Sequence, residues 1–196
     1  TLSDKVIVAK NGEAAFRPGR EAALIRRLVA MEHDVAPTML LGIWRQIMAA
    51  SLTRQNTGLA FAVHQAAMPA AIWHTGGAFK TKPCDDYKTV LHQLETASCR
   101  YGIVPAGNDD VALALAIRTA TQFYIIARTP LFSIPTVPPA FIIADYLPDE
   151  SGDDISLFAV PQADDSFKIL AFDGYFDDDL PKGCDPAAQL LGIYAR

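Results

Sequence analysis

The stretch PTMLLGIWRQIMAASLTRQ, residues 37–55, decides how the first part of this chain folds. Its apolar residues recur at helical spacing, so we expect one long helix with a buried stripe. That stripe is predicted to comprise Leu40, Trp44, Ile47, Met48, Ser51 and Gln55. Ser51 and Gln55 are four residues apart and share a face, so both can point into one pocket. Polar groups in an apolar wall are typical of a small-molecule site, but helix ends are also commonly polar.

A second helix is predicted immediately upstream. Residues 21–31 carry apolar side chains at helical spacing, whereas Arg26 and Arg27 fall on the outer side. Asn11-Gly12 and Pro18-Gly19 bound a predicted loop. Residues 1–57 are therefore expected to form a helical module. The first residues, TLSDKVIVAK, are typical of the middle of an element, so we expect the natural chain to begin earlier.

Beyond Gly58 the hydrophobic pattern changes to short apolar runs of strand length. These predicted strands are residues 59–63, 70–73, 101–104, 123–127, 141–144, 155–160 and 167–172. Helical patterns lie between some of them, at residues 86–96 and at residues 109–119, where Asn108 or Asp109 is the expected cap. The alternation predicts an α/β sheet covered on both faces. The expected fold class is thus multidomain, with a helical module at 1–57 and an α/β domain at 58–196.

The bulk composition excludes several classes of protein. With 51% hydrophobic and 20% charged residues, the chain is typical of a soluble globular protein. A net charge of −5 argues against broad nucleic-acid binding, and no apolar run is long enough for a membrane span. Three cysteines without a CxxC pair argue against zinc and against a disulfide framework, which favours a cytoplasmic protein. The four histidines show no metal-binding spacing and are expected to be surface or structural residues.

A set of polar residues extends the pattern around Ser51 and Gln55. Lys10 follows Val8-Ala9, Arg17 and Arg20-Glu21 open the second predicted helix, and Ser51-x-x-x-Gln55 closes the long one. Together these spacings resemble the all-helical chorismate mutases, and most of all the mutase module that is fused to prephenate dehydratase in bifunctional enzymes. The resemblance covers residues 4–55. Each element alone also has an ordinary reading as a helix cap or a surface charge.

The resemblance implies a role for each matching side chain. Lys10 and Gln55 would donate hydrogen bonds to the ether oxygen of chorismate, and Glu21 would accept one from the ring hydroxyl. Arg20 and Ser51, with Arg17 beside them, would hold the carboxylate side of the ligand. The rearrangement of chorismate to prephenate needs no cofactor or metal. It needs a compact conformer of the dianion and stabilisation of charge on the ether oxygen.

The sequence also departs from the mutase pattern. In that family two further arginines on the first half of a long first helix bind the carboxylates, one of them reaching across a dimer. This chain starts at Thr1, after the point where those arginines would stand. Arg17 stands where the family often has an acidic residue. The family builds its sites from intertwined chains, so the resemblance implies a homodimer.

Residues 58–196 resemble the prephenate dehydratases, a two-lobed α/β fold similar to periplasmic binding proteins. Residues 59–63 are placed like the first strand, and Tyr101-Gly102-Ile103-Val104-Pro105 is similar to the family's Tyr-Gly-Val-Val-Pro motif. The catalytic Thr-Arg-Phe motif is missing, since residues 153–158 read DDISLF. Where the dehydratase family has a Gly-Pro-x-Gly loop, this sequence has His64-Gln65-Ala66-Ala67. Where the family has a Glu-Asn pair, it has Ala106-Gly107. We therefore expect a dehydratase-like domain without dehydratase activity.

Two charged features of this second part have alternative interpretations. Acidic pairs and triplets occur at residues 109–110, 153–154, 164–165 and 177–179. They suggest a metal site, but loop and cap roles explain them better because none has a calcium-loop pattern. Arg118 and Arg128 could line an anion pocket, although charges at element ends are the ordinary reading.

The sequence thus predicts a cytoplasmic, homodimeric chorismate mutase with a degenerate dehydratase-like domain and no cofactor. Two alternatives stay open. One is a bifunctional enzyme that also dehydrates prephenate, and the other is a non-catalytic protein that binds a metabolite of the same pathway. Binding to nucleic acid or to a membrane is not expected.

Overall fold

The structure, a computed structural model, describes residues 16–31, 34–55, 60–107, 113, 117, 119–120, 122–162 and 166–196. Its helices are α2 (Pro18–Ala30), α3 (Pro37–Gln55), α4 (Met68–Thr75) and α5 (Tyr87–Glu95), with a 3₁₀ turn η1 (Gln65–Ala67). Its strands are β1 (Ala60–His64), β2 (Lys80–Cys84), β3 (Tyr101–Pro105), β4 (Tyr124–Thr129), β5 (Ala140–Ala144), β6 (Asp154–Pro161), β7 (Phe167–Asp173) and β8 (Gln189–Ala195). Most of the predicted helix at 109–119 lies outside the described residues.

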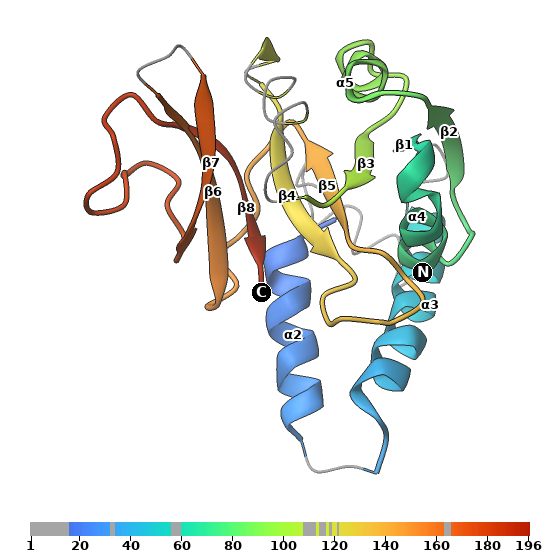
Figure 1. Ribbon diagram of the computed structural model, residues 1–196. Coiled ribbons are helices and arrows are strands. Elements are labelled where there is room, and N and C mark those ends of the chain that lie inside the picture. Colours follow the sequence, from blue (N-terminus) through green and yellow to red (C-terminus); the bar gives the residue numbers. More distant parts are fainter. Residues whose placement is uncertain are drawn as a thin grey trace.

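All eight of these strands join one mixed sheet, in the order β2-β1-β3-β5-β4-β8-β6-β7. β1 pairs in parallel with β2 and β3, whereas β5 runs antiparallel to β3 and β4. β4 and β8 are parallel, and β6 is antiparallel to both β7 and β8. The two lobes expected from the sequence are therefore not separate sheets. Figure 1 shows the strands β6 to β8 standing at one side of this continuous sheet.

The part of the sheet around β1, β3 and β5 is buried on both faces, as predicted. One face packs under α5, through a cluster that includes Val90, Leu94 and Ile143. The other face packs under α4, through a cluster that includes Phe61, Ala70 and Ile142. Because strands covered on both faces have no polar side to show, their sequences read as continuous apolar runs.

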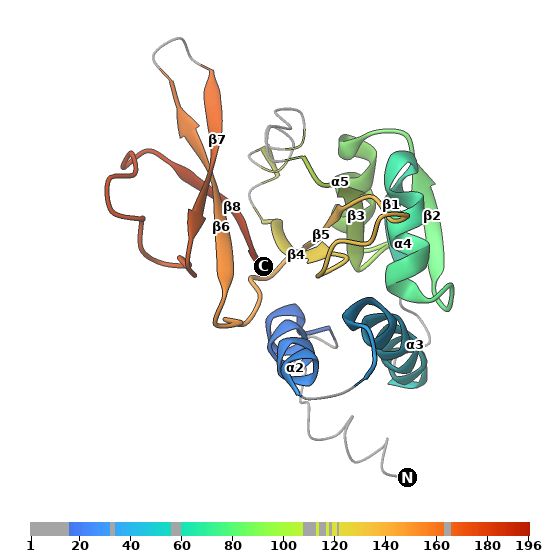
Figure 2. The same cartoon turned by 60° about the horizontal axis from the view of Figure 1, so that its bottom comes forward.

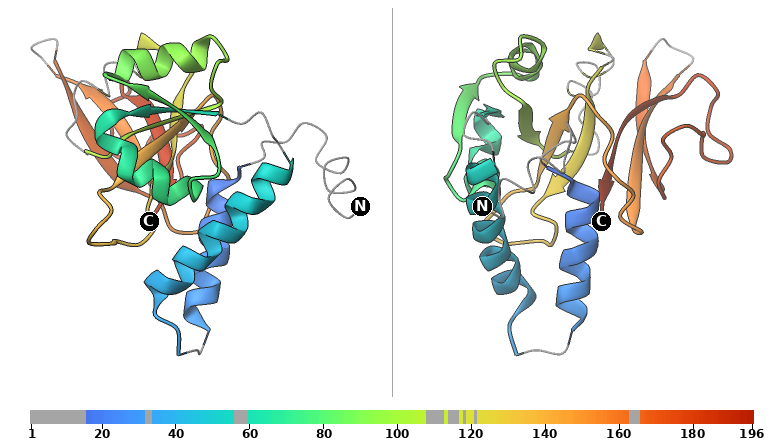
Figure 3. Two further views of the ribbon diagram at one scale, coloured as in Figure 1. Left: turned by 90° about the vertical axis from the view of Figure 1, so that its right-hand side faces the viewer. Right: turned by 180° about the vertical axis from the view of Figure 1, so that it is seen from behind.

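The helices α2 and α3 form an antiparallel hairpin that projects from one end of this α/β part (Figures 1 and 3). The start of α2 and the end of α3 lie against the α/β part, whereas the end of α2 and the start of α3 lie at the far tip, which comes toward the reader in Figure 2. A third cluster of Ala22, Ile25, Leu41, Leu131 and Ala195 fills the junction. The helical part is thus packed onto the sheet domain, and no separate all-helical module is found among the described residues.

The structure corrects several sequence predictions. Residues 70–73 are not a strand but part of α4, which has a proline in its first turn. A short apolar run does not distinguish a strand from a buried helix, and Pro69 suits a helix start. The strands β2 and β8 were not predicted. β2 (KTKPC) is an edge strand with mostly exposed or half-exposed side chains, so it lacks an apolar pattern. Pro18-Gly19 begins α2 and is not part of a loop.

The buried stripe of α3 also differs from the prediction. Leu41, Arg45 and Ala49 face the protein interior. The predicted stripe member Ile47 is 55% exposed, and Leu40, Trp44, Met48 and Ser51 are half-buried. Met39 and Ile43 are apolar although they lie on the outer side. The hydrophobic pattern therefore did not indicate which face of α3 is buried. A charged residue at the centre of the inner face is not expected from a hydrophobic pattern.

Candidate functional site

The hairpin brings the start of α2 beside the second half of α3, where most of the predicted site residues lie. Glu21 is buried on α2, and Arg20 next to it is exposed. Ser51 is half-buried in α3, and Gln55 is the last residue of that helix. Lys10 and the side chain of Gln55 lie outside the described residues. The structure therefore places Arg20, Glu21 and Ser51 at the same end of the hairpin, and their predicted roles stay predictions.

Arg17 is engaged by a partner in the α/β part. Its Nε and Nη2 donate to the two carboxylate oxygens of Asp149, each at 2.8 Å. These hydrogen bonds lower the pKa of Asp149. In this structure the guanidinium of Arg17 thus fixes the first turn of α2 to the loop before β6, which differs from the ligand-holding role that the sequence predicted.

Glu21 faces Arg45 on α3 in a buried ion pair. Nη1 of Arg45 lies 2.8 Å from Oε1 of Glu21, and their side chains are 10% and 5% exposed respectively. Apart from this ion pair, Oε1 of Glu21 and Nε of Arg45 have no hydrogen-bond partner among the described residues. Because an unpaired buried charge is very costly, each of these side chains depends on the other.

The α/β part supplies the remaining neighbours of Arg45 from the end of α4. The guanidinium carbon lies 5.8 Å from the ring centre of Trp73, within range of a cation–π contact. His74 is buried, and its Nδ1 lies 3.2 Å from the hydroxyl of Thr129 at the end of β4. The ring of Phe16, just before α2, packs edge-on against His74. Hairpin, α4 and β4 therefore meet at this cluster.

Burial sets the electrostatics of the three ionisable side chains. It raises the pKa of Glu21, an effect that the charge of Arg45 and the indole of Trp44 partly offset. It lowers the pKa of Arg45, and Glu21 opposes that change. Burial and then the charge of Arg45 lower the pKa of His74 well below its ordinary value, so its ring is neutral at pH 7.

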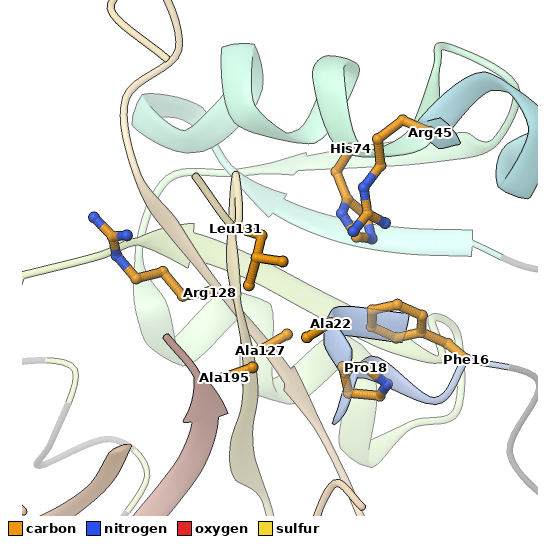
Figure 4. Close-up of a pocket in the computed structure, with 9 residues that line it drawn as sticks. All are labelled: Phe16, Pro18, Ala22, Arg45, His74, Ala127, Arg128, Leu131 and Ala195. Atoms are coloured by element: carbon orange, nitrogen blue, oxygen red, sulfur yellow. The ribbon is translucent and has the colours of Figure 1, made fainter. Parts of the chain in front are cut away.

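A small cavity of about 20 Å³ adjoins this cluster. Figure 4 shows the side chains of Arg45 and His74 converging on one side of it. It is lined by Phe16, Pro18, Ala22, Arg45, His74, Ala127, Arg128, Leu131 and Ala195. Its volume is enough for about one water molecule. Arg128, which the sequence singled out as a possible anion-pocket residue, does line it.

Sequence reasoning missed Arg45 and His74 as members of a site. The available signal was an arginine four residues from both Leu41 and Ala49, which places it on their face of the helix. Nothing in the sequence indicates that His74 meets Arg45, because the two side chains come from different elements.

Several residues in the segments compared above with dehydratase motifs make contacts within the fold. Ser156, within the DDISLF segment, is fully buried and donates to the carbonyl of Gly174 at 2.8 Å. Its hydroxyl also accepts from the backbone of Phe176. After β1, His64 accepts a hydrogen bond from Ala66 and its ring packs against Tyr87. In the acidic segments, Asp154 accepts from Ser151, and Asp153 pairs with Arg196. These contacts account for both acidic side chains as turn and surface-pair residues.

No described helix combines the length and the apolarity that crossing a bilayer requires. The cysteines Cys84, Cys99 and Cys184 are all free thiols.

No protein-family model matches the sequence, and no curated protein matches it significantly. Solved structures do resemble it. A prephenate dehydratase from Arthrobacter aurescens, solved in complex with L-Phe, has a TM-score of 0.50 and 11% identity, over 70% of this chain and 90% of that chain. A prephenate dehydratase from Streptococcus mutans has a TM-score of 0.48 and 12% identity, over 70% of this chain and 98% of that one. GqqA, described as a novel type of quorum-quenching acylase, has a TM-score of 0.48 and 12% identity, over 70% and 95%. At this level of identity, the likeness to the Arthrobacter enzyme shows a shared fold: the α/β part of this chain is folded like a prephenate dehydratase.

Proposed function

We propose that this protein is a chorismate mutase whose site lies on the helical hairpin, at the end that meets the α/β part. One observation carries the proposal furthest. The hairpin is antiparallel, so Arg20 and Glu21 at the start of α2 lie at the same end as Ser51 and Gln55 on α3. This shared end of the hairpin supports a common site for Arg20, Glu21 and Ser51.

The chemistry of these side chains suits the rearrangement. Lys10 and Gln55 would donate to the ether oxygen, where negative charge grows as the carbon–oxygen bond breaks. Glu21 would accept from the ring hydroxyl, and Arg20 with Ser51 would hold a carboxylate. Because the reaction is intramolecular, holding the reactive conformer also lowers the barrier.

The alternative of a second, dehydratase activity has less support. Ser156 stands in the segment that corresponds to the family's catalytic motif, yet its hydroxyl is buried and bonded to main-chain groups. These two bonds account for the hydroxyl as part of the main-chain structure after β7.

The test is the loss of chorismate absorbance with the full-length natural protein, with prephenate identified as the product. Lys10→Ala and Gln55→Ala are expected to lower kcat more than they raise KM, because their hydrogen bonds strengthen as charge develops. Losses confined to KM would contradict the assigned roles. Absence of turnover in the wild-type protein would overturn the proposed activity.

A non-catalytic metabolite-binding protein is the second candidate. It is favoured by a fold shared with a dehydratase that was solved with L-Phe. This candidate predicts that chorismate, prephenate or L-Phe raises the unfolding temperature without any turnover, because a ligand that binds only the folded state stabilises it.

A further inference from the structure

Arg45 lies between the hairpin and the α/β part and contacts both. On one side its Nη1 meets Glu21 at 2.8 Å, and on the other its guanidinium lies over Trp73. Its residue exposure is only 8%, so these contacts fix its position. Glu21 is the carboxylate to which the proposed function gives a ligand contact.

We propose that Arg45 is a positioning residue: its guanidinium, held against Trp73 of the α/β part, orients the carboxylate of Glu21 toward the ligand. This inference rests on the proposed function. It assigns the α/β part a role in mutase activity, because the residue that orients Glu21 is itself held by α4.

A purely stabilising role does not explain the pair. Removing two charges from water costs several kcal/mol per ion, and hydrophobic replacements of such pairs are often equally stable or more stable. Ile25, one helical turn from Glu21, and Leu41, one turn from Arg45, belong to the apolar cluster of the junction, which would suit an apolar pair. A fixed orientation of one carboxylate is something that an apolar pair cannot provide.

The charged group that meets Glu21 is Arg45 on α3, and the indole of Trp44 also acts on its carboxylate. His74 on α4 and Arg128 on β4 line the cavity beside Arg45. His74 is neutral at pH 7, so Arg45 supplies the positive charge in direct contact with Glu21. Removing that charge would raise the pKa of Glu21 further.

The experiment measures kcat and KM for chorismate across a range of pH in the full chain. The variants are Arg45→Met and Arg45→Lys, with Arg27→Met as a control on the exposed side of α2. Arg45→Met is expected to lower kcat about 100-fold with KM changed less than about 3-fold, because misplacing a reacting group costs rate more than binding. Its kcat is also expected to fall off at a higher pH than in the wild type, since an ionised Glu21 is needed.

Arg45→Lys keeps the charge and loses the planar fork, so it is expected to lower kcat about 10-fold without moving the pH profile. This variant tests the inference by itself if Arg45→Met fails to fold. Unchanged kcat in Arg45→Lys, or an unmoved pH profile in a folded Arg45→Met, would overturn the positioning role while leaving the mutase assignment intact. A wild-type protein without turnover would instead overturn the proposed function, and this role with it.

Discussion

At the scale of single residues, the junction between hairpin and sheet removes Glu21, Arg45 and His74 from water. Glu21 and Arg45 offset each other's burial cost, whereas His74 stays neutral. The neutral ring fits beside a guanidinium because a second positive charge there would be repelled. One ion pair and one neutral imidazole are therefore compatible in the same buried space.

His74 makes the stability of the protein depend on pH. Its pKa is lowered in the folded state, so below about pH 6.5 the unfolded chain binds a proton that the folded chain does not. The stability is fully present above that pH and falls as the pH drops, by up to about 1.4 kcal/mol per pH unit. His74→Gln is expected to remove this part of the slope, as measured by urea unfolding at several pH values. His92→Gln, at an exposed position, should keep the wild-type slope; an unchanged slope in His74→Gln would contradict a neutral buried ring.

At the scale of elements, two glycines show how differently the hairpin helices are placed. A Cβ on Gly19, in the first turn of α2, would lie 1.7 Å from the carbonyl oxygen of Asp149. A Cβ on Gly42, in α3, would meet nothing within 4 Å. The start of α2 is thus in direct backbone contact with the loop before β6, whereas α3 at Gly42 borders open space.

The matched pair Gly19→Ala and Gly42→Ala should therefore change stability in opposite directions. Gly42→Ala is expected to stabilise by about 0.5–1 kcal/mol, because alanine loses less backbone entropy on entering a helix. Gly19→Ala is expected to destabilise by more than about 2 kcal/mol, since α2 must move away from Asp149. The measurement is the free energy of unfolding in urea. A neutral Gly19→Ala would show that α2 does not pack on this loop as described.

At the scale of the whole molecule, polar contacts from α2 attach the hairpin to the far part of the sheet. Arg26 donates to the main-chain oxygens of Arg196 at 2.6 Å, Asp153 at 2.8 Å and Ser151 at 3.1 Å. With the Arg17–Asp149 pair, these bonds join α2 to the segments that flank β6 and β8. Hairpin and sheet are therefore expected to unfold together.

Arg26→Met is expected to lower the free energy of unfolding by about 1–3 kcal/mol, because it leaves main-chain oxygens without their charged donor. The adjacent Arg27→Met, at an exposed position, should change it by less than about 0.5 kcal/mol. Urea unfolding followed by both tryptophan fluorescence and circular dichroism measures these values. If the two probes gave separate transitions, hairpin and sheet would not form one cooperative unit.

Much of this architecture could be predicted from local patterns. Six of the seven predicted strands are present, because runs such as Phe141-Ile142-Ile143 are buried on both faces. The strand predicted at 70–73 was wrong, since a helix covering a sheet is as apolar as a strand within it. β2 was missed because an edge strand needs no apolar side chains. Candidate site residues such as Glu21 and Ser51 could be proposed from their residue types. The neighbours that they contact could not be predicted.

The sequence by itself determined the two helices of the hairpin, most of the strands, and the motif from Lys10 to Gln55, since these depend on spacing along the chain. Only the tertiary structure decided which face of α3 is buried, that Arg45 pairs with Glu21, and that Trp73 and His74 complete the cluster. The physical reason is that an arginine enters a protein interior only when a distant carboxylate offsets its desolvation. The partner of Arg45 lies on another helix, so the sequence around Arg45 does not indicate which residue it is.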